Sequence, residues 1–312
     1  MELFRNAHFD FLGKKWWFIL PSLILIVAGL ASIVARRGQI YSIDFRSGAV
    51  MEVRWEGTPP IDRIRAAISV RLAGASVVAA HESSGGNTII ISTELPHGEE
   101  LTALRQTIVS SLSTIGSQYS VNSFEVIGPQ ISSDLRHQAL MATAGASAGM
   151  LIYLSYRFRL AYGAAAVVAM THDAIITIGV LSLFHQQISL TVVAALLTLI
   201  GYSMNDTIVV FDRIRENRRL NQREPLESVI NRSINQTLSR TVLTSGLTLL
   251  SALSLLVFGG PVLFGFSLTL TIGIVVGTFS SVFIASPIML AWERQSAGSK
   301  QRQLSLHSGG QI

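Results

Sequence analysis

Long apolar runs separated by short polar stretches dominate the chain, except between residues 36 and 137, where polar and apolar positions alternate. A helix needs about 20 mostly apolar residues to cross the hydrocarbon core of a bilayer. Six runs reach about that length, and we predict them as membrane-spanning helices: 16–35, 138–156, 162–184, 189–211, 241–258 and 262–292. Pro287 is expected to disturb the final turns of the last and longest span.

The alternating segment, residues 36–137, predicts a soluble α+β domain inserted between the first two spans. Alternation with a period of two predicts strands, and apolar residues three or four apart predict amphipathic helices. The predicted order is strand, helix, strand, strand, helix, strand, over residues 49–55, 60–72, 76–81, 88–93, 99–112 and 119–127. This is the order of the ferredoxin-like, split βαβ fold.

Lysine and arginine gather at every second connection after the second span. These basic connections are residues 157–161, 212–240 and 293–312, and those between them carry neither residue type. Under the positive-inside rule, we expect both ends, residues 1–15 and 293–312, in the cytoplasm of a bacterium and residues 36–137 in the periplasm. Basic residues flank the first span on both sides, so this span alone does not fix its own orientation. A signal peptide stays an alternative for it, because Gly29-Leu30-Ala31 weakly resembles a cleavage site.

Composition supports an integral membrane protein and excludes other classes. Only 14% of residues are charged, against about 25% in a typical soluble domain. The chain has no cysteine, so a disulfide or a thiolate metal site is impossible. The arginines of the 212–240 connection are a topology signal rather than a nucleic-acid surface. Within it, residues 225–237 predict an interfacial amphipathic helix, and residues 296–312 are polar and expected to be disordered.

One carboxylate, Asp206, lies inside a predicted span. It lies about 9 Å from the basic end of that span, too deep for its short side chain to reach water. A charged residue at this depth is costly, and it usually handles ions or protons. A low dielectric favours its protonated form. Ser203, Asn205 and Thr207 can hydrogen-bond to it, and the alternative is a structural aspartate that caps a helix or pairs with an arginine.

Three other charged residues are candidates beside Asp206. Arg240 begins the fifth span, either as an interfacial anchor or as a partner that pairs with ionised Asp206 and parts from the protonated form. Asp173 lies near the bilayer midplane with His172 beside it, in a proton relay or in structural pairing. Asp212 faces a different side of the helix from Asp206 and is expected in an interfacial charge cluster.

Two pairs of glycines are spaced for close helix contact. They are Gly145 with Gly149 in the second span and Gly273 with Gly277 in the sixth. Packing inside the bundle is the preferred interpretation, and a seam with a second membrane subunit is the alternative.

Signatures of enzymes are missing from the sequence. It contains no HExxH, no Walker A motif and no GxSxG. Gly85 and Gly86 form a predicted turn rather than a phosphate-binding loop. Aspartyl proteolysis would need two carboxyl groups that face each other, and the sequence gives no sign that Asp173 and Asp206 do. We therefore expect a protein that is not an enzyme and that uses neither a cofactor nor a metal.

A series of short motifs in a fixed order resembles the SecF group of the SecD/SecF family, within the RND (resistance–nodulation–division) superfamily. The resemblance covers residues 9–293. The motifs are Asp44-Phe45 with Gly48, Gly128-Pro129, His172-Asp173, residues 201–217, residues 235–241, residues 244–246 and residues 258–261. In the first motif Ser47 stands where the family usually has glycine.

The resemblance implies a role in protein export. Members pair with SecD in a twelve-helix complex that attaches to the SecYEG channel, with YajC and YidC as further possible partners. The complex uses the proton-motive force to pull unfolded precursor chains out on the periplasmic side, after the ATP-driven step. The resemblance also implies that Asp206 and Arg240 belong to the proton pathway, together with an aspartate from SecD. We expect Asp44, Gly48, Gly128 and Pro129 to transmit motion to the periplasmic domain.

Two other functions stay open. A small-molecule transporter half of the RND type would need a substrate pocket in the 36–137 domain. A passive scaffold of the translocase would tolerate the change Asp206→Asn while the folded protein stayed necessary.

Overall fold

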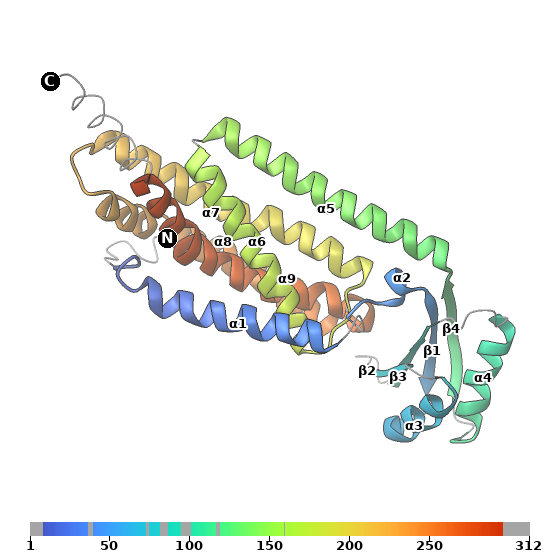
Figure 1. The fold of residues 1–312 in the computed structure, drawn as a ribbon. Coiled ribbons are helices and arrows are strands. Elements are labelled where there is room, and N and C mark those ends of the chain that lie inside the picture. Colours follow the sequence, from blue (N-terminus) through green and yellow to red (C-terminus); the bar gives the residue numbers. More distant parts are fainter. Residues whose placement is uncertain are drawn as a thin grey trace.

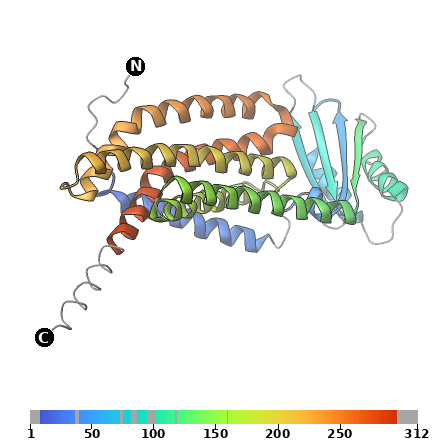
Figure 2. The same cartoon turned by 90° about the horizontal axis from the view of Figure 1, so that it is seen from above.

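A computed structural model describes residues 9–36, 40–72, 75–81, 87–94, 101–116, 119–158 and 160–295. A bundle of long helices forms most of the molecule, and a small α+β domain lies at one end of it (Figure 1). A view turned by 90° shows the same separation, with the bundle helices running along the long axis (Figure 2).

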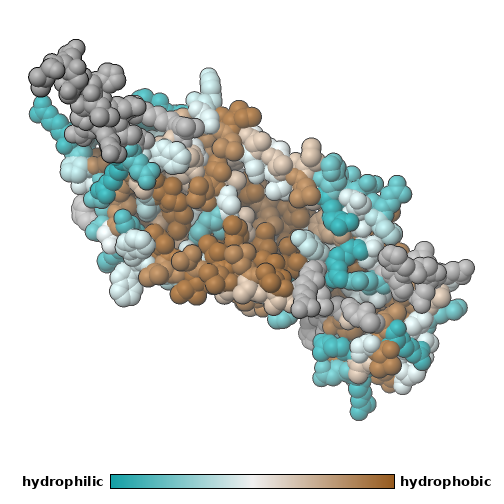
Figure 3. All heavy atoms as spheres, viewed as in Figure 1, coloured by the Kyte–Doolittle hydropathy of each residue, from teal (hydrophilic) through white to brown (hydrophobic). Residues whose placement is uncertain are grey.

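Six helices in the described part of the chain are long and apolar enough to cross a membrane. They are α1 (Lys15–Ala35), α5 (Pro129–Arg157), α6 (Leu160–Leu183), α7 (Leu190–Leu220), α8 (Leu226–Phe258) and α9 (Gly260–Ser280), which continues to residue 295. A broad apolar band covers the bundle on the face shown in Figure 3, with polar surface at both ends. This band and the six helices confirm the polytopic membrane fold.

Two helices begin earlier than the predicted spans because helical backbone extends beyond the apolar run. Helix α5 begins at Pro129 rather than residue 138, and proline is well tolerated at a first helical position. The predicted separation of an amphipathic helix, residues 225–237, from a fifth span is wrong, since α8 runs through both without a break. No glycine or proline lies between residues 226 and 245 to end the helix.

The disturbance expected from Pro287 lies on its N-terminal side. Residues Ser281–Ala285 form a π-helix, η1, between α9 and the last helical turns. Proline has no N–H to donate to the carbonyl group four residues earlier, here that of Phe283. A π-helical turn is one way for a long helix to absorb such a lost bond.

The domain at the end of the bundle is a four-stranded antiparallel sheet with two helices. Strands β1 (Gly48–Trp55), β2 (Ser76–His81), β3 (Asn87–Thr93) and β4 (Tyr119–Ile127) pair in the order β2-β3-β1-β4. Helices α3 (Ile61–Arg71) and α4 (Leu101–Ser113) bury Ile64, Ile68, Leu104 and Ile108 against the sheet. The strand order and the connecting helices confirm the ferredoxin-like arrangement. The predicted turn at Gly85 and Gly86 lies outside the described residues.

A short segment ties the entrance of this domain to the turn between α6 and α7. Tyr41 pairs with Ile188 in a β-bridge, and the Ser42 N–H donates to the Ile188 carbonyl at 2.9 Å. The one-turn helix α2 (Ile43–Arg46) follows, and the sequence pattern did not predict it. We call residues 40–44 the strap.

Glycines allow a close crossing of α1 and α6. A Cβ atom added to Gly29 would lie 2.5 Å from the Cα atom of Gly179. Ser22 and Ser32 of α1 also hydrogen-bond to His172 and Ser182 of α6. The first helix is therefore an integral part of the bundle.

The two glycine pairs singled out in the sequence have different surroundings. Added Cβ atoms at Gly273 and Gly277 would meet Leu199 and Ser203 of α7 at less than 3 Å, so this pair packs inside the bundle as predicted. Gly145 and Gly149 on α5 are exposed, and an added Cβ atom would meet nothing within 4 Å. Internal packing is therefore wrong for the α5 pair.

Candidate functional site: two aspartates inside the helical bundle

Asp206 lies on the inner face of α7 with only 3% of its surface exposed. Its Oδ2 atom accepts a hydrogen bond of 3.0 Å from the Ser245 hydroxyl of α8. Thr278 of α9 in turn donates to the Ser245 hydroxyl at 2.8 Å. A carboxyl group and two hydroxyl groups thus form a chain across three helices.

Arg240 makes no ion pair with Asp206, both of which lie in the described part of the chain. Arg240 lies five residues before Ser245 on α8, which corresponds to about 140° of rotation. Arg240 nevertheless lies close enough to Asp206 for its charge to act on the carboxyl group, without direct contact between the two. The exposed Arg240 instead lines a hollow of about 440 Å³ that Asp212 and Glu216 also line.

Asp173 on α6 is the second buried carboxylate, with 2% of its surface exposed. Its Oδ2 atom accepts hydrogen bonds from Ser203 at 2.6 Å and from Ser280 at 2.8 Å. Its Oδ1 atom lies 3.1 Å from Nδ1 of His172, whose Nε2 lies 3.0 Å from the Ser22 hydroxyl. The neighbouring imidazole thus turns back onto Asp173 and links it to α1.

The three residues expected to bind Asp206 do not contact it through hydrogen bonds. Ser203 donates to Asp173 instead. Thr207 is buried and pairs with the Ser281 hydroxyl of η1 at 2.9 Å. Asn205 is exposed on the outer face of α7. Asn205 and Thr207, next to Asp206, point about 100° away from it, and the Ser203 hydroxyl is engaged by Asp173, so closeness in sequence gave the wrong partners.

The other predicted residues lie at the two ends of the bundle. Asp212 is half-exposed and forms an ion pair of 2.9 Å with Arg157, as expected for an interfacial charge cluster. Asp44 accepts a hydrogen bond of 2.9 Å from the Leu190 N–H, so the strap caps the first turn of α7. Gly128 and Pro129 form the junction between β4 and α5.

Gly48 is required where β1 begins. A Cβ atom at this position would lie 2.5 Å from the Thr93 carbonyl oxygen. The preceding Ser47 has φ 62° and ψ 141°, a conformation that favours glycine. The departure from the family motif at Ser47 therefore falls at a strained residue.

Sequence reasoning missed the hydroxyl groups that surround both carboxyl groups. Ser245, Thr278 and Ser280 lie 30 or more residues away from the aspartates they serve. Serine and threonine are common in membrane helices, where most bind the carbonyl group one turn earlier. Their presence alone could not have identified these three.

The two carboxyl groups have separate sets of partners, and no hydrogen bond joins them within the described residues. This is not the arrangement of an aspartyl protease. No group of three His, Asp or Glu side chains suited to a metal gathers in the same part of the chain. What the geometry offers is two buried carboxyl groups, each held by neutral donors.

Comparison with known proteins gives a consistent result. Residues 107–295 match the family described as protein export membrane protein SecD/SecF, C-terminal. The protein translocase subunit SecF of Koribacter versatilis is 40% identical, over 94% of each chain. The subunit of the same name from Escherichia coli O157:H7 is 39% identical, over 90% of this chain and 87% of that one.

Solved structures of longer proteins share the fold. SecDF of Thermus thermophilus, described as a translocon-associated membrane protein, matches 94% of this chain with a TM-score of 0.81 and 35% identity. A SecDF structure in a super-membrane-facing form matches 96% with a TM-score of 0.67 and 33% identity. This chain spans 40% of the length of either SecDF chain. The fold, the family match and the near full-length relatives together show that the chain belongs to the SecD/SecF family of protein-export membrane proteins.

Proposed function

We propose that this chain is an auxiliary subunit of the Sec translocase that uses the proton-motive force to promote export of precursor proteins across the bacterial inner membrane, after the ATP-driven step. Its relatives are named translocase subunits, and SecDF is a longer chain of which it spans 40%. This supports a SecD-type partner that supplies the rest of the assembly. The SecYEG channel, with YajC and YidC, is the proposed site of attachment.

The burial and the hydrogen bonding of Asp206 are the main support for proton coupling. The carboxyl group is buried in a membrane-spanning helix, and a neutral group, the Ser245 hydroxyl, donates a hydrogen bond to it. An ionised carboxylate in a low dielectric needs a cation or several donors, whereas a protonated carboxyl group does not. The arrangement therefore suits the protonated state, with Arg240 nearby but not in an ion pair with Asp206.

Loss of the proton would change which contacts of α8 are favourable. Coulomb attraction between opposite charges is strong where water is excluded, so ionised Asp206 attracts Arg240. Arg240 and Ser245 lie on one helix, about 7.5 Å apart along its axis. A direct ion pair between Arg240 and ionised Asp206 would therefore favour a rotation or a slide of α8 against α7. In the mechanism we propose, each proton that binds and leaves Asp206 moves α8 in this way.

Asp173 has the place of a second proton-accepting group in this mechanism. It is buried, and it accepts a hydrogen bond from Ser203, which is on the same helix as Asp206. Its link through His172 to Ser22 extends the polar network to α1. Motion of α7 is passed to the domain through the strap, because Asp44 caps that helix.

In this role the protein has a defined topology in the membrane. Both termini lie in the cytoplasm and residues 36–137 in the periplasm, where the domain meets the exported, unfolded chain. The proton gradient supplies the energy, without a cofactor and without enzymatic chemistry on the precursor. Lipid surrounds the bundle, and nucleic acid has no part.

The test is export of a precursor in a strain depleted of its own SecF-type subunit. The full chain is supplied with its SecD-type partner, as wild type, as Asp206→Asn and as Asp134→Asn, at equal membrane levels. Asp134 is an exposed carboxylate on α5, so its variant controls for the chemical change alone. We expect wild type and Asp134→Asn to restore export and Asp206→Asn to fail. Equal export by all three would make Asp206 structural and favour a scaffold.

A further inference from the structure

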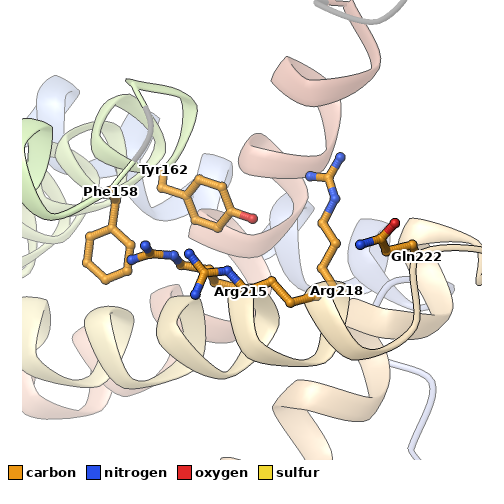
Figure 4. Close-up of a pocket in the computed structure, with 6 residues that line it drawn as sticks. Phe158, Tyr162, Arg215, Arg218 and Gln222 are labelled. Atoms are coloured by element: carbon orange, nitrogen blue, oxygen red, sulfur yellow. The ribbon is translucent and has the colours of Figure 1, made fainter.

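Three arginines of α7 converge on a hollow at the end of the bundle away from the domain. Arg215, Arg218 and Arg219 lie three and four residues apart, on one face of the helix. With Phe158, Tyr162 and Gln222 they line a space of about 510 Å³ (Figure 4).

Two of these arginines have no carboxylate partner among the described residues. Arg218 forms an ion pair of 2.9 Å with Glu293. Arg215 donates only to a neutral group, the Arg157 carbonyl, at 3.2 Å, and Arg219 is exposed. The nearby acidic side chains are engaged elsewhere, Asp212 with Arg157 and Glu216 with Arg213.

Close guanidinium groups repel each other unless an anion lies between them. Asp212 and Glu216 line the neighbouring hollow, but the ion pairs above compensate their charges. The positive charge of Arg215 and Arg219 is therefore left for a group from outside the chain. Arginine favours phosphate for this purpose, since its planar fork can donate two parallel hydrogen bonds to two oxygens.

Two mostly buried aromatic rings, those of Phe158 and Tyr162, form the wall of the hollow where two spans adjoin. Phe158 ends α5, and Tyr162 lies in the first turn of α6, so both mark the boundary of adjoining spans. Their rings stack at 6.1 Å, and Tyr162 packs edge-on against Phe211 at 5.3 Å. Aromatic rings are common at the depth of lipid headgroups, and basic pockets between spans bind anionic ones.

We propose that Arg215 and Arg219, with Phe158 and Tyr162 as the apolar wall, bind the phosphate headgroup of an anionic phospholipid in the leaflet on the side of the chain termini. The arginines contact the phosphate, and the aromatic wall contacts the glycerol and the first acyl carbons. This site is separate from the two buried aspartates, so its test is independent of proton coupling.

The experiment measures the melting temperature of the delipidated full-length protein in detergent, titrated with phosphatidylglycerol or with phosphatidylcholine. We expect phosphatidylglycerol to raise the melting temperature at concentrations where phosphatidylcholine has no effect. For Arg215→Gln with Arg219→Gln, the phosphatidylglycerol concentration needed should rise about thirtyfold, since each surface arginine contributes a factor of about five. If the double variant does not fold, Arg219→Gln alone should show a shift of about fivefold.

A matched control removes the same charge outside the hollow. Arg223→Gln takes one exposed arginine from the same connection, outside the lining of the hollow, and is compared with Arg219→Gln alone. We expect this control to respond to phosphatidylglycerol as wild type does. An equal loss in Arg223→Gln and Arg219→Gln would show general electrostatic attraction and overturn the site.

A second arm separates lipid from free phosphate. Inorganic phosphate is titrated in place of lipid, and we expect no rise of the melting temperature at equal concentration. A rise equal to that with phosphatidylglycerol would identify a soluble phosphate compound as the ligand and overturn the lipid assignment. A double variant that keeps its lipid response but no longer co-purifies with a SecD-type partner would show a protein contact instead.

Discussion

Serine hydroxyl groups bind both carboxyl groups inside the bundle. A hydroxyl group can donate to a carboxylate or accept from a carboxylic acid, simply by rotating its hydrogen. An arginine or lysine can only donate, and its charge would hold a neighbouring carboxyl group in the ionised state. Ser203, Ser245 and Ser280 therefore allow Asp173 and Asp206 to gain or lose a proton without leaving a buried group unpaired.

Ser47 gives a prediction at the same scale. Its φ of 62° is rare for a residue with a side chain, and such positions cost about 1–3 kcal/mol. We expect Ser47→Gly to raise the free energy of unfolding by about 1 kcal/mol, measured as a higher melting temperature of the full chain.

The control for this prediction is Ser47→Ala. Alanine keeps the Cβ atom, and so the strain, but removes the hydroxyl group that donates to the Arg46 carbonyl. We expect no gain in stability. A gain as large as that of the glycine variant would place the cost in the hydroxyl group rather than in the backbone.

At the scale of elements, the sequence predicted the helices and strands whose apolar positions recur with a regular period. It did not predict features without such a period. The spans and the four strands follow from hydropathy, because the buried face of each element recurs with its own period. The continuous path of α8 could not be predicted that way. Hydropathy reports the change from water to lipid near Arg240, whereas the backbone stays helical through it. The partners of Asp206 depend on how distant helices rotate against each other, which no local pattern records.

The crossing of α1 and α6 gives a prediction for elements. Gly29→Ala should lower the free energy of unfolding by about 1–3 kcal/mol, since its Cβ atom would meet the backbone of Gly179 and overpack the contact. Thermal unfolding of the purified full chain measures the effect.

Gly145→Ala is the matched control on α5. Both changes improve helix propensity by about 1 kcal/mol, but the methyl group at Gly145 points into open space. We expect this variant to be as stable as wild type or slightly more stable. A loss equal to that of Gly29→Ala would mean that helix contact does not explain the first result.

For the whole molecule, the strap is a direct connection between the domain and the helix that carries Asp206. It pairs with the α6–α7 turn, and its Asp44 caps α7. Because Gly48 and β1 follow within a few residues, the first strand of the domain is held close to the start of α7. A movement of α7 along its axis therefore acts on the sheet without a flexible linker between them.

A disulfide across the strap tests whether export needs this connection to open. The chain has no cysteine, so Tyr41→Cys with Ile188→Cys creates the only pair. If the domain must leave the turn during each cycle, oxidation stops export in membrane vesicles and a reductant restores it. Each single variant controls for the substitutions. Full export by the oxidised pair would show that the strap stays closed throughout.

Because α8 is unbroken, it can move as one rigid rod and transmit motion from one end to the other. Its 33 residues span about 50 Å. A tilt of about 5° about one end would displace the other end by about 4 Å, comparable to the spacing of neighbouring atoms in a packed helix contact. The half of α8 on the side of the chain termini carries Arg232, and the half within the membrane carries Ser245. A force on the end of α8 nearer the chain termini would therefore change the length of the hydrogen bond between Ser245 and Asp206.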